Sequence, residues 1–117
     1  MEILETRRSD VMTVTLRGRL DASSSGLVQD RLVHLIDSGE HRLIVDLGPL
    51  EYVSSVGVRV FLSVAKRLSA HGGRIALCRP QATVRHVFEI AGFGDPAAFG
   101  RVLVICEDVD HAAAVLQ

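Results

Sequence analysis

The chain has 117 residues, 48% of them hydrophobic, and its 13 basic and 14 acidic side chains leave a formal charge of −1. This length fits one domain, residues 1–117, which buries roughly two-thirds of its unfolded surface without needing disulfides or a structural metal. The near-neutral charge, with four Phe, one Tyr and no Trp, argues against a nucleic-acid binder. The N-terminal segment has glutamates where a signal peptide has basic residues, and the chain lacks an apolar run of about 20 residues. These features predict a cytoplasmic protein without direct membrane insertion.

The first 40 residues predict a β-hairpin followed by a helix. Residues 12–16 alternate between apolar and polar, which is typical of a half-exposed strand, and residues 3–4 are expected to pair with it near a sheet edge. Aspartate and serine residues at 21–25 supply N-cap chemistry for a helix with apolar residues at 28, 32, 35 and 36. Gly39 then ends this helix.

The rest of the chain alternates between strands and helices. Residues 43–47 are almost continuously apolar, which predicts a central strand covered on both faces. Helical spacing of apolar residues predicts helices over 57–68, 84–91 and 109–116, and short apolar runs predict strands at 75–78 and 102–105. The order ββαβαβαβα indicates an α/β fold with a mixed, mostly parallel β-sheet packed with helices. Binding chemistry in such folds collects at the carboxyl ends of the strands.

Two adjacent hydroxyls mark the start of the second helix. If Ser54 is the N-cap, its oxygen accepts a backbone N–H two or three residues on, and Ser55 keeps its hydroxyl free at the first helical position. A phosphoryl group on Ser55 would add about −1.5 to −2 charges beside the positive helix end, which the domain would tolerate and a partner packed over it would not. The alternative is that both serines serve only as the cap and its neighbour.

The surface of this helix offers a second indication of a binding role. A glycine at 57 costs about 1 kcal/mol relative to alanine in a helix, which makes sense where another backbone approaches closely. Val58 and Leu62 lie off the core stripe, next to Arg59, so they form either a protein docking surface or a buried face that is wider than average. The predicted partner interface is Ser54, Gly57, Val58, Arg59 and Leu62.

Asp21 ends a Gly-Arg-Leu-Asp segment at the exit of the second strand. Its carboxylate is expected either to cap the first helix or to face Ser55 across neighbouring strand-to-helix junctions. In the second arrangement, Asp21 would orient Ser55 or engage the enzyme that modifies it.

Sequence motifs for catalysis, metals and cofactors are missing. The serines lack the G-x-S-x-G pattern of a nucleophile elbow, and no glycine-rich phosphate loop follows a strand. The five histidines lack ligand spacing, and Cys78 and Cys106 lie 28 residues apart, which favours buried, reduced thiols at strand ends over a zinc site. We therefore expect a non-enzymatic protein without metal or cofactor.

Residues 18–21, 43–47 and 50–59 resemble the STAS domain of bacterial anti-sigma factor antagonists, and the resemblance extends over essentially the whole chain. It implies that Ser55, two residues before the glycine that opens the second helix, is phosphorylated by a switch kinase that is itself the anti-sigma factor. Asp21 would support this site. Many regulatory members carry an acid where this chain has Ser54, so Ser54 is the alternative phosphorylation site.

The resemblance implies a partner switch in the regulation of transcription. The unphosphorylated domain would bind the switch-kinase anti-sigma factor and release its sigma factor or other target, phosphorylation would abolish binding, and a metal-dependent serine phosphatase would restore it. STAS domains also serve as accessory subunits of lipid-transport ATPase complexes, which is the second hypothesis. A small nucleotide-binding or hydrolytic domain is the third.

Overall fold

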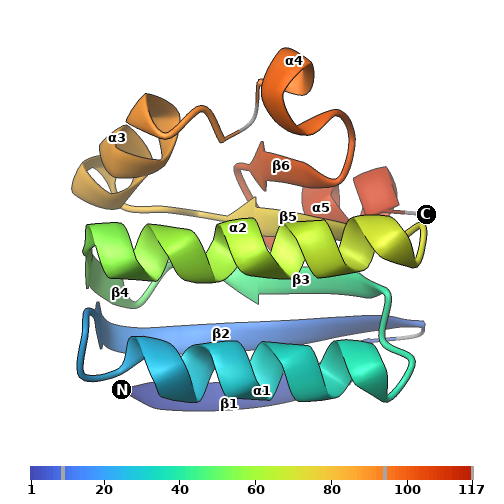
Figure 1. The fold of residues 1–117 in the computed structure, drawn as a ribbon, viewed down its shortest axis with the longest axis horizontal. Coiled ribbons are helices and arrows are strands. Elements are labelled where there is room, and N and C mark those ends of the chain that lie inside the picture. Colours follow the sequence, from blue (N-terminus) through green and yellow to red (C-terminus); the bar gives the residue numbers. More distant parts are fainter. Residues whose placement is uncertain (9, 94, 117) are drawn as a thin grey trace.

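The computed structural model describes residues 1–8, 10–93 and 95–116 (Figure 1). Its strands are β1 (Glu2–Arg8), β2 (Val11–Leu20), β3 (Arg42–Asp46), β4 (Leu50–Val53), β5 (Arg74–Cys78) and β6 (Leu103–Cys106). Its helices are α1 (Ser25–Asp37), α2 (Ser55–Ala70), α3 (Ala82–Ile90), α4 (Pro96–Phe99) and α5 (Val109–Leu116). Within these described residues, no helix combines the length and the apolar character needed to cross a bilayer.

The predicted α/β class is confirmed, but the predicted order ββαβαβαβα omitted two short elements, β4 and α4. In β4, the buried residues Leu50 and Val53 flank the exposed residues Glu51 and Tyr52, so the strand does not alternate between apolar and polar positions. Helix α4 has four residues, which is about one turn and too short to show an apolar period. Neither element carries the pattern on which sequence prediction depends.

The sheet is parallel except at one edge. Its strand order is β1-β2-β3-β5-β6, with β1 antiparallel to β2 and β3 in the centre, as predicted. Strand β2 is long enough to change partners, because it pairs with β3 up to Thr15 and with β4 from Gly18 onward. The chain therefore leaves β4 and enters α2 directly beside the carboxyl end of β2.

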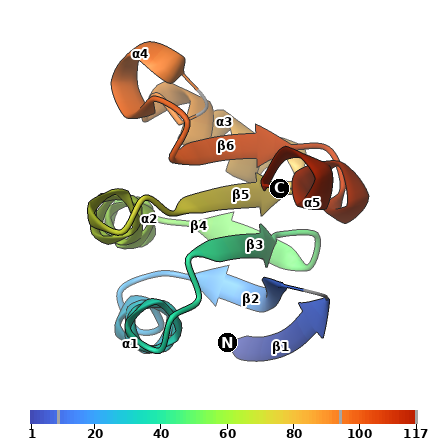
Figure 2. The ribbon, with the colours of Figure 1, turned by 90° about the vertical axis from the view of Figure 1, so that its right-hand side faces the viewer.

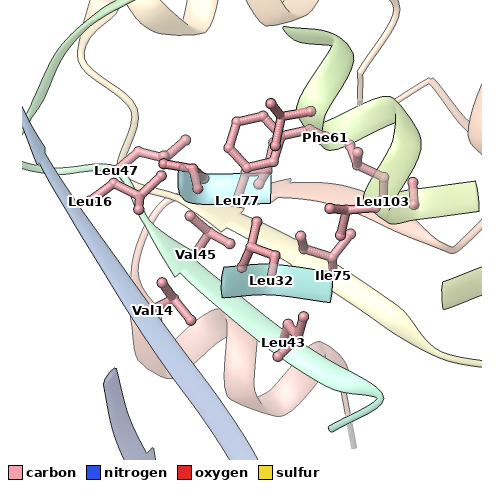
Figure 3. Packing of buried hydrophobic residues seen from close by; sticks show 14 of the residues in the cluster. Val14, Leu16, Leu32, Leu43, Val45, Leu47, Phe61, Ile75, Leu77 and Leu103 are labelled. Carbon is pink, nitrogen blue, oxygen red and sulfur yellow. The ribbon is translucent and has the colours of Figure 1, made fainter. Parts of the chain in front are cut away.

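Helices cover both faces of the sheet. Figure 2 shows α1 and α2 on one side and α5 on the other. On the first side, Leu32 of α1 and Phe61 of α2 pack among strand residues such as Val45 and Leu77 (Figure 3). Burial of these side chains is the main source of stability, at roughly 25 cal/mol per Å² of apolar surface removed from water.

The second face has a smaller core, in which Ile44 and Ala76 pack with Ala112 and Leu116 of α5. This face corrects the prediction that the strand at 12–16 is half-exposed, because Thr13 is also buried. Thr13 is the register partner of Ile44 on β3, whereas Thr15 is only half-buried.

The two cysteines end neighbouring strands. Cys78 and Cys106 are register partners on β5 and β6, and both are buried with free thiols, as predicted. Burial raises the pKa of the Cys78 thiol to about 12 and also raises that of Cys106. Both side chains are therefore protonated and act as small apolar residues at neutral pH.

Candidate functional site

The strand register brings the two predicted polar segments together. Leu20 at the end of β2 pairs with Val53 at the end of β4, and the backbone N–H of Ser54 donates to the carbonyl of Leu20 at 2.9 Å. Asp21 and Ser54 are the next residues on these two parallel strands, so they leave the sheet side by side. The two strand-to-helix junctions are therefore neighbours, but within the described residues the hydrogen bonds of the Asp21 carboxylate go to Ser23 and Ser24 and not to Ser55.

An ion pair fixes the turn that leads into β4. Arg79, which follows β5, donates two hydrogen bonds of 3.0 Å to the carboxylate of Asp46 at the end of β3. The same carboxylate accepts from the backbone N–H of Gly48 at 3.0 Å, and the amide of Gln81 donates to the carbonyl of Gly48 at 2.9 Å. This network joins β3, β5 and the turn before β4, and no sequence motif reveals it because Arg79 and Gln81 each lie 33 positions from the residue that they contact.

Ser54 is the N-cap of α2, as predicted. Its backbone is extended, and its hydroxyl oxygen accepts the N–H of Gly57 at 3.2 Å. Ser55 follows as the first helical residue and is exposed to solvent. The hydroxyl of Ser54 is therefore occupied by the cap, whereas that of Ser55 faces solvent at the positive end of the helix.

Gly57 is needed inside the fold rather than at the surface. A Cβ at this position would lie 2.8 Å from Cγ of Leu20, 2.9 Å from Cγ2 of Val53 and 3.0 Å from the carbonyl oxygen of Leu20. The close backbone approach predicted for this glycine is thus to the end of β2. Its predicted place in the partner interface needs correction, because Gly57 is buried beneath the first turn.

The predicted exposed side of α2 is correct for one of its two apolar members. Leu62 is 37% exposed, but Val58 is only 9% exposed and belongs to the main core, so Val58 follows the alternative of a wider buried face. Val58 lies one turn after Ser54, on the side of α2 that it shares with Val53 of β4 and Val87 of α3. Val58 still forms part of the floor of a surface hollow.

This hollow, which we call the serine groove, has a volume of about 550 Å³ and lies between α2 and α3. Ser54, Ser55, Val58, Arg59 and Leu62 line it from α2. Tyr52 and Val53 of β4 and Val87, Ile90 and Ala91 line the other side. The groove is mostly apolar and has the two serines at one end and the exposed Arg59 on its rim. Such a surface suits a protein segment better than a small polar ligand.

A comparison with protein families assigns this architecture. The family model described as the STAS domain matches residues 3–111. The chain belongs to the STAS domain family. One relative of this STAS domain is BtrV of Bordetella bronchiseptica, whose name places it among the anti-sigma factor antagonists. It is 37% identical over 93 residues, which is 80% of each chain.

Solved structures share the STAS fold at low sequence identity. A crystal structure of an anti-sigma factor antagonist from Mycobacterium paratuberculosis has a TM-score of 0.83 and 16% identity, and covers 98% of this chain and 92% of its own. Unphosphorylated SpoIIAA, also an anti-sigma factor antagonist, has a TM-score of 0.72 and 20% identity over 97% and 94% of the two chains. Phosphorylated SpoIIAA from Bacillus has a TM-score of 0.71 and 21% identity over 97% and 96%.

Asp21 in this STAS domain organises its own turn. Its carboxylate accepts from the backbone N–H of Ser23 at 3.0 Å and from the hydroxyl of Ser23 at 2.7 Å. The Ser23 hydroxyl holds the pKa of Asp21 below its ordinary value. The N-cap of α1 is Ser24. Asp21 thus stabilises the turn that precedes α1, one residue after the strand pair that leads to Ser54.

Sequence prediction missed Ile90 of the serine groove and the contact that Arg19 makes with the groove residue Tyr52. Ile90 on α3 is 74% exposed, and the guanidinium of Arg19 lies 4.2 Å from the centre of the Tyr52 ring. The apolar stripe of α3 did not include Ile90, and a large apolar residue off a stripe was the available signal. Within the described residues, His, Cys, Asp and Glu form no group of three or more that could hold a metal ion.

Proposed function

We propose that this STAS domain is a phosphorylation-gated anti-sigma factor antagonist that acts in the cytoplasm. The unphosphorylated domain binds a switch-kinase anti-sigma factor through the serine groove and thereby releases the sigma factor or other target. The anti-sigma factor then transfers the γ-phosphoryl group of ATP to Ser55, and the complex dissociates. A metal-dependent serine phosphatase hydrolyses the phosphoserine and restores binding.

The observation that carries this proposal is the exposed hydroxyl of Ser55 at the first position of α2, at one end of an apolar groove. Ser54, the alternative acceptor, is half-buried and its oxygen already accepts the N–H of Gly57. Phosphorylation of Ser54 would compete with the helix cap, whereas phosphorylation of Ser55 leaves the cap in place. The names of the relatives agree with this role, and SpoIIAA, which shares the fold, occurs in a phosphorylated form.

The physical effect of a phosphate differs between the free and bound domain. In the free domain, about −1.5 to −2 charges at the N-terminus of α2 meet the positive end of the helix dipole and remain in water. In the complex, the same charges would be buried without full pairing, which costs several kcal/mol, and each 1.4 kcal/mol weakens affinity about tenfold. One phosphate therefore releases the partner without unfolding the domain.

The phosphorylation site is tested with the switch-kinase anti-sigma factor encoded by the same organism. After incubation with ATP, intact-mass measurement should show one added phosphoryl group on the wild-type domain and on Ser54→Ala, and none on Ser55→Ala. Modification of Ser55→Ala to the wild-type extent would contradict the assignment. Asp21→Ala should keep the site but slow the reaction, because the turn beside Ser54 loses the hydrogen bonds that its carboxylate accepts.

Binding is tested by calorimetry with the same anti-sigma factor. We expect Ser55→Glu to weaken binding at least about tenfold, while its thermal midpoint stays within about 2 °C of wild type, since Ser55 makes a surface contribution only. A large loss of stability without loss of intrinsic affinity would instead mean that Ser55 is a purely structural residue.

A further inference from the structure

A second hollow lies on the second half of α2, away from Ser55. It has a volume of about 340 Å³, and we call it the distal hollow. Its lining includes Leu62, Ala65 and Lys66 of α2, Phe99 of α4 and Val102. In Figure 1, α3 lies above the first half of α2 and α4 above the second half. Residues of α3 line the serine groove, and residues of α4 line the distal hollow. Leu62 lines both hollows and joins their floors.

The two hollows share one stripe of α2. Ser55, Arg59, Leu62, Lys66 and Ser69 follow one another at spacings of four, three, four and three residues, which places them on the same side of a helix. Each of them lines the serine groove or the distal hollow. Ser55 and Lys66 are separated by roughly 16 Å at about 1.5 Å per residue. A partner segment laid along the stripe would therefore reach both hollows.

The stripe carries positive charge that the domain does not neutralise. Helix α2 contains Arg59, Lys66 and Arg67 and no acidic residue. Arg67 lies off the stripe and pairs with Asp37 of α1 at 3.0 Å. Among the residues that the structure describes, neither Arg59 nor Lys66 takes part in an ion pair. Neither hollow is lined by a carboxylate.

We propose that the distal hollow binds an apolar segment of the anti-sigma factor that presents a carboxylate to Lys66. This inference rests on the proposed function, because the same partner would occupy the serine groove. The partner is then held at two points on α2. At roughly 16 Å from Ser55, the distal contact lies beyond the Debye length of about 8 Å at physiological salt, so a phosphate on Ser55 acts on the serine groove alone. The distal contact adds affinity that does not depend on phosphorylation.

Carbodiimide cross-linking tests the contact directly, because it joins an amine to a carboxylate in contact with it and Lys66 is the only lysine of the chain. In the complex with the anti-sigma factor, we expect an amide bond between Lys66 and a Glu or Asp of the partner, located by mass spectrometry of the digested product. Lys66→Arg should bind like wild type and lose this cross-link. A complex that forms with wild-type affinity and never cross-links through Lys66 would overturn the inference.

Affinity measurements supply a matched pair of variants. Lys66→Gln and Arg67→Gln each remove one positive charge from adjacent positions of α2. We expect Lys66→Gln to weaken binding about fivefold and Lys66→Glu about tenfold or more, while Arg67→Gln changes it less than about twofold. Wild-type binding should also fall more steeply with ionic strength than that of Lys66→Gln.

A combined variant separates this inference from the proposed function. Ser55→Glu and Lys66→Glu should weaken binding by factors that multiply, because the two contacts are far apart. If Lys66→Glu binds like wild type while Ser55→Glu still weakens binding, the distal contact is wrong and the proposed function stands. If the wild-type domain binds no switch-kinase anti-sigma factor, the proposed function fails and this inference fails with it.

Discussion

Two neighbouring helices of this STAS domain begin in the same way in sequence and differently in structure. Helices α1 and α2 each have a serine as N-cap and a second serine as first helical residue. At α1, Ser24 and Ser25 are 8% and 6% exposed. At α2, Ser54 is half-buried and Ser55 is exposed. Of these four serines, Ser55 alone is exposed and offers its hydroxyl to a modifying enzyme.

The difference comes from the connection that precedes each helix. Before α1, the chain makes a turn in which the hydroxyl of Ser24 donates to the carbonyl of Arg19 at 2.7 Å and accepts from the N–H of Asp21 at 3.1 Å. Before α2, β4 runs straight into the helix, and the hydroxyl of Ser54 caps it. A serine pair at a helix start thus indicates a modification site only where one hydroxyl makes the N-cap hydrogen bond and the other is exposed to solvent.

The largest expected difference between the two helix starts is the change in stability when the glycine of the first turn is replaced by alanine. Gly57→Ala should destabilise the domain by about 1 to 3 kcal/mol, because its Cβ would meet the side chain and carbonyl of Leu20 and the side chain of Val53 within 3.0 Å. Gly26→Ala in the first turn of α1 is the matched control, since its Cβ would meet nothing within 4 Å. That change should be neutral or stabilise by up to about 1 kcal/mol.

Urea denaturation of the two alanine variants measures these changes. Equal stabilities of Gly57→Ala and wild type would show that α2 can shift away from β2. The first turn of α2 would then pack against Leu20 and Val53 less tightly than the structure shows. Loss of stability in Gly26→Ala would contradict the open space at the start of α1.

Serine-to-alanine variants should give a graded series. Ser24→Ala leaves two part-buried backbone groups without partners and should cost about 1 to 3 kcal/mol. Ser54→Ala loses the cap of α2 and should cost about 1 kcal/mol. Ser55→Ala should change stability by less than about 0.5 kcal/mol, as is usual for exposed side chains. Thermal or urea unfolding measures the series, and a cost at Ser55 equal to that at Ser54 would remove the distinction on which the site assignment depends.

The roles of the two serines at the start of α2 were predictable from the sequence because they depend on local chemistry. The N-cap role of Ser54 and the free position of Ser55 depend on backbone geometry within four residues, and both were predicted correctly. The burial of Gly57 and Val58 depends on what packs against α2, and the spacing of residues could not decide whether Val58 is exposed or buried. Periodicity alone does not distinguish a wide core face from a docking surface. The distinction depends on the position of the neighbouring helix, here α3.

The long-range parts of the site were not predictable for a similar reason. The pairing of β4 with β2 requires β2 to continue beyond its contact with β3, which no pattern in residues 50–53 reveals. The ion pair between Asp46 and Arg79 and the facing position of Ile90 likewise follow from the strand order. These contacts depend on which strands are neighbours in the sheet, and only the structure shows that order.

The smallest expected difference is in pH dependence. The pKa of Asp21 is lowered in the folded domain by the Ser23 hydroxyl, so its stabilising hydrogen bonds are fully present above the pKa of the unfolded chain, which is near 3.8, and are lost as the pH falls through the lower folded value. No acidic residue lies in the first turn of α2. In an NMR titration, the amide of Ser23 should therefore follow the protonation of Asp21, with a midpoint below 3.8, while the amide of Gly57 stays unchanged. Asp21→Asn should abolish the Ser23 transition, and a Gly57 amide that titrates together with Ser23 would mean that the two helix starts are coupled through Asp21 rather than independent.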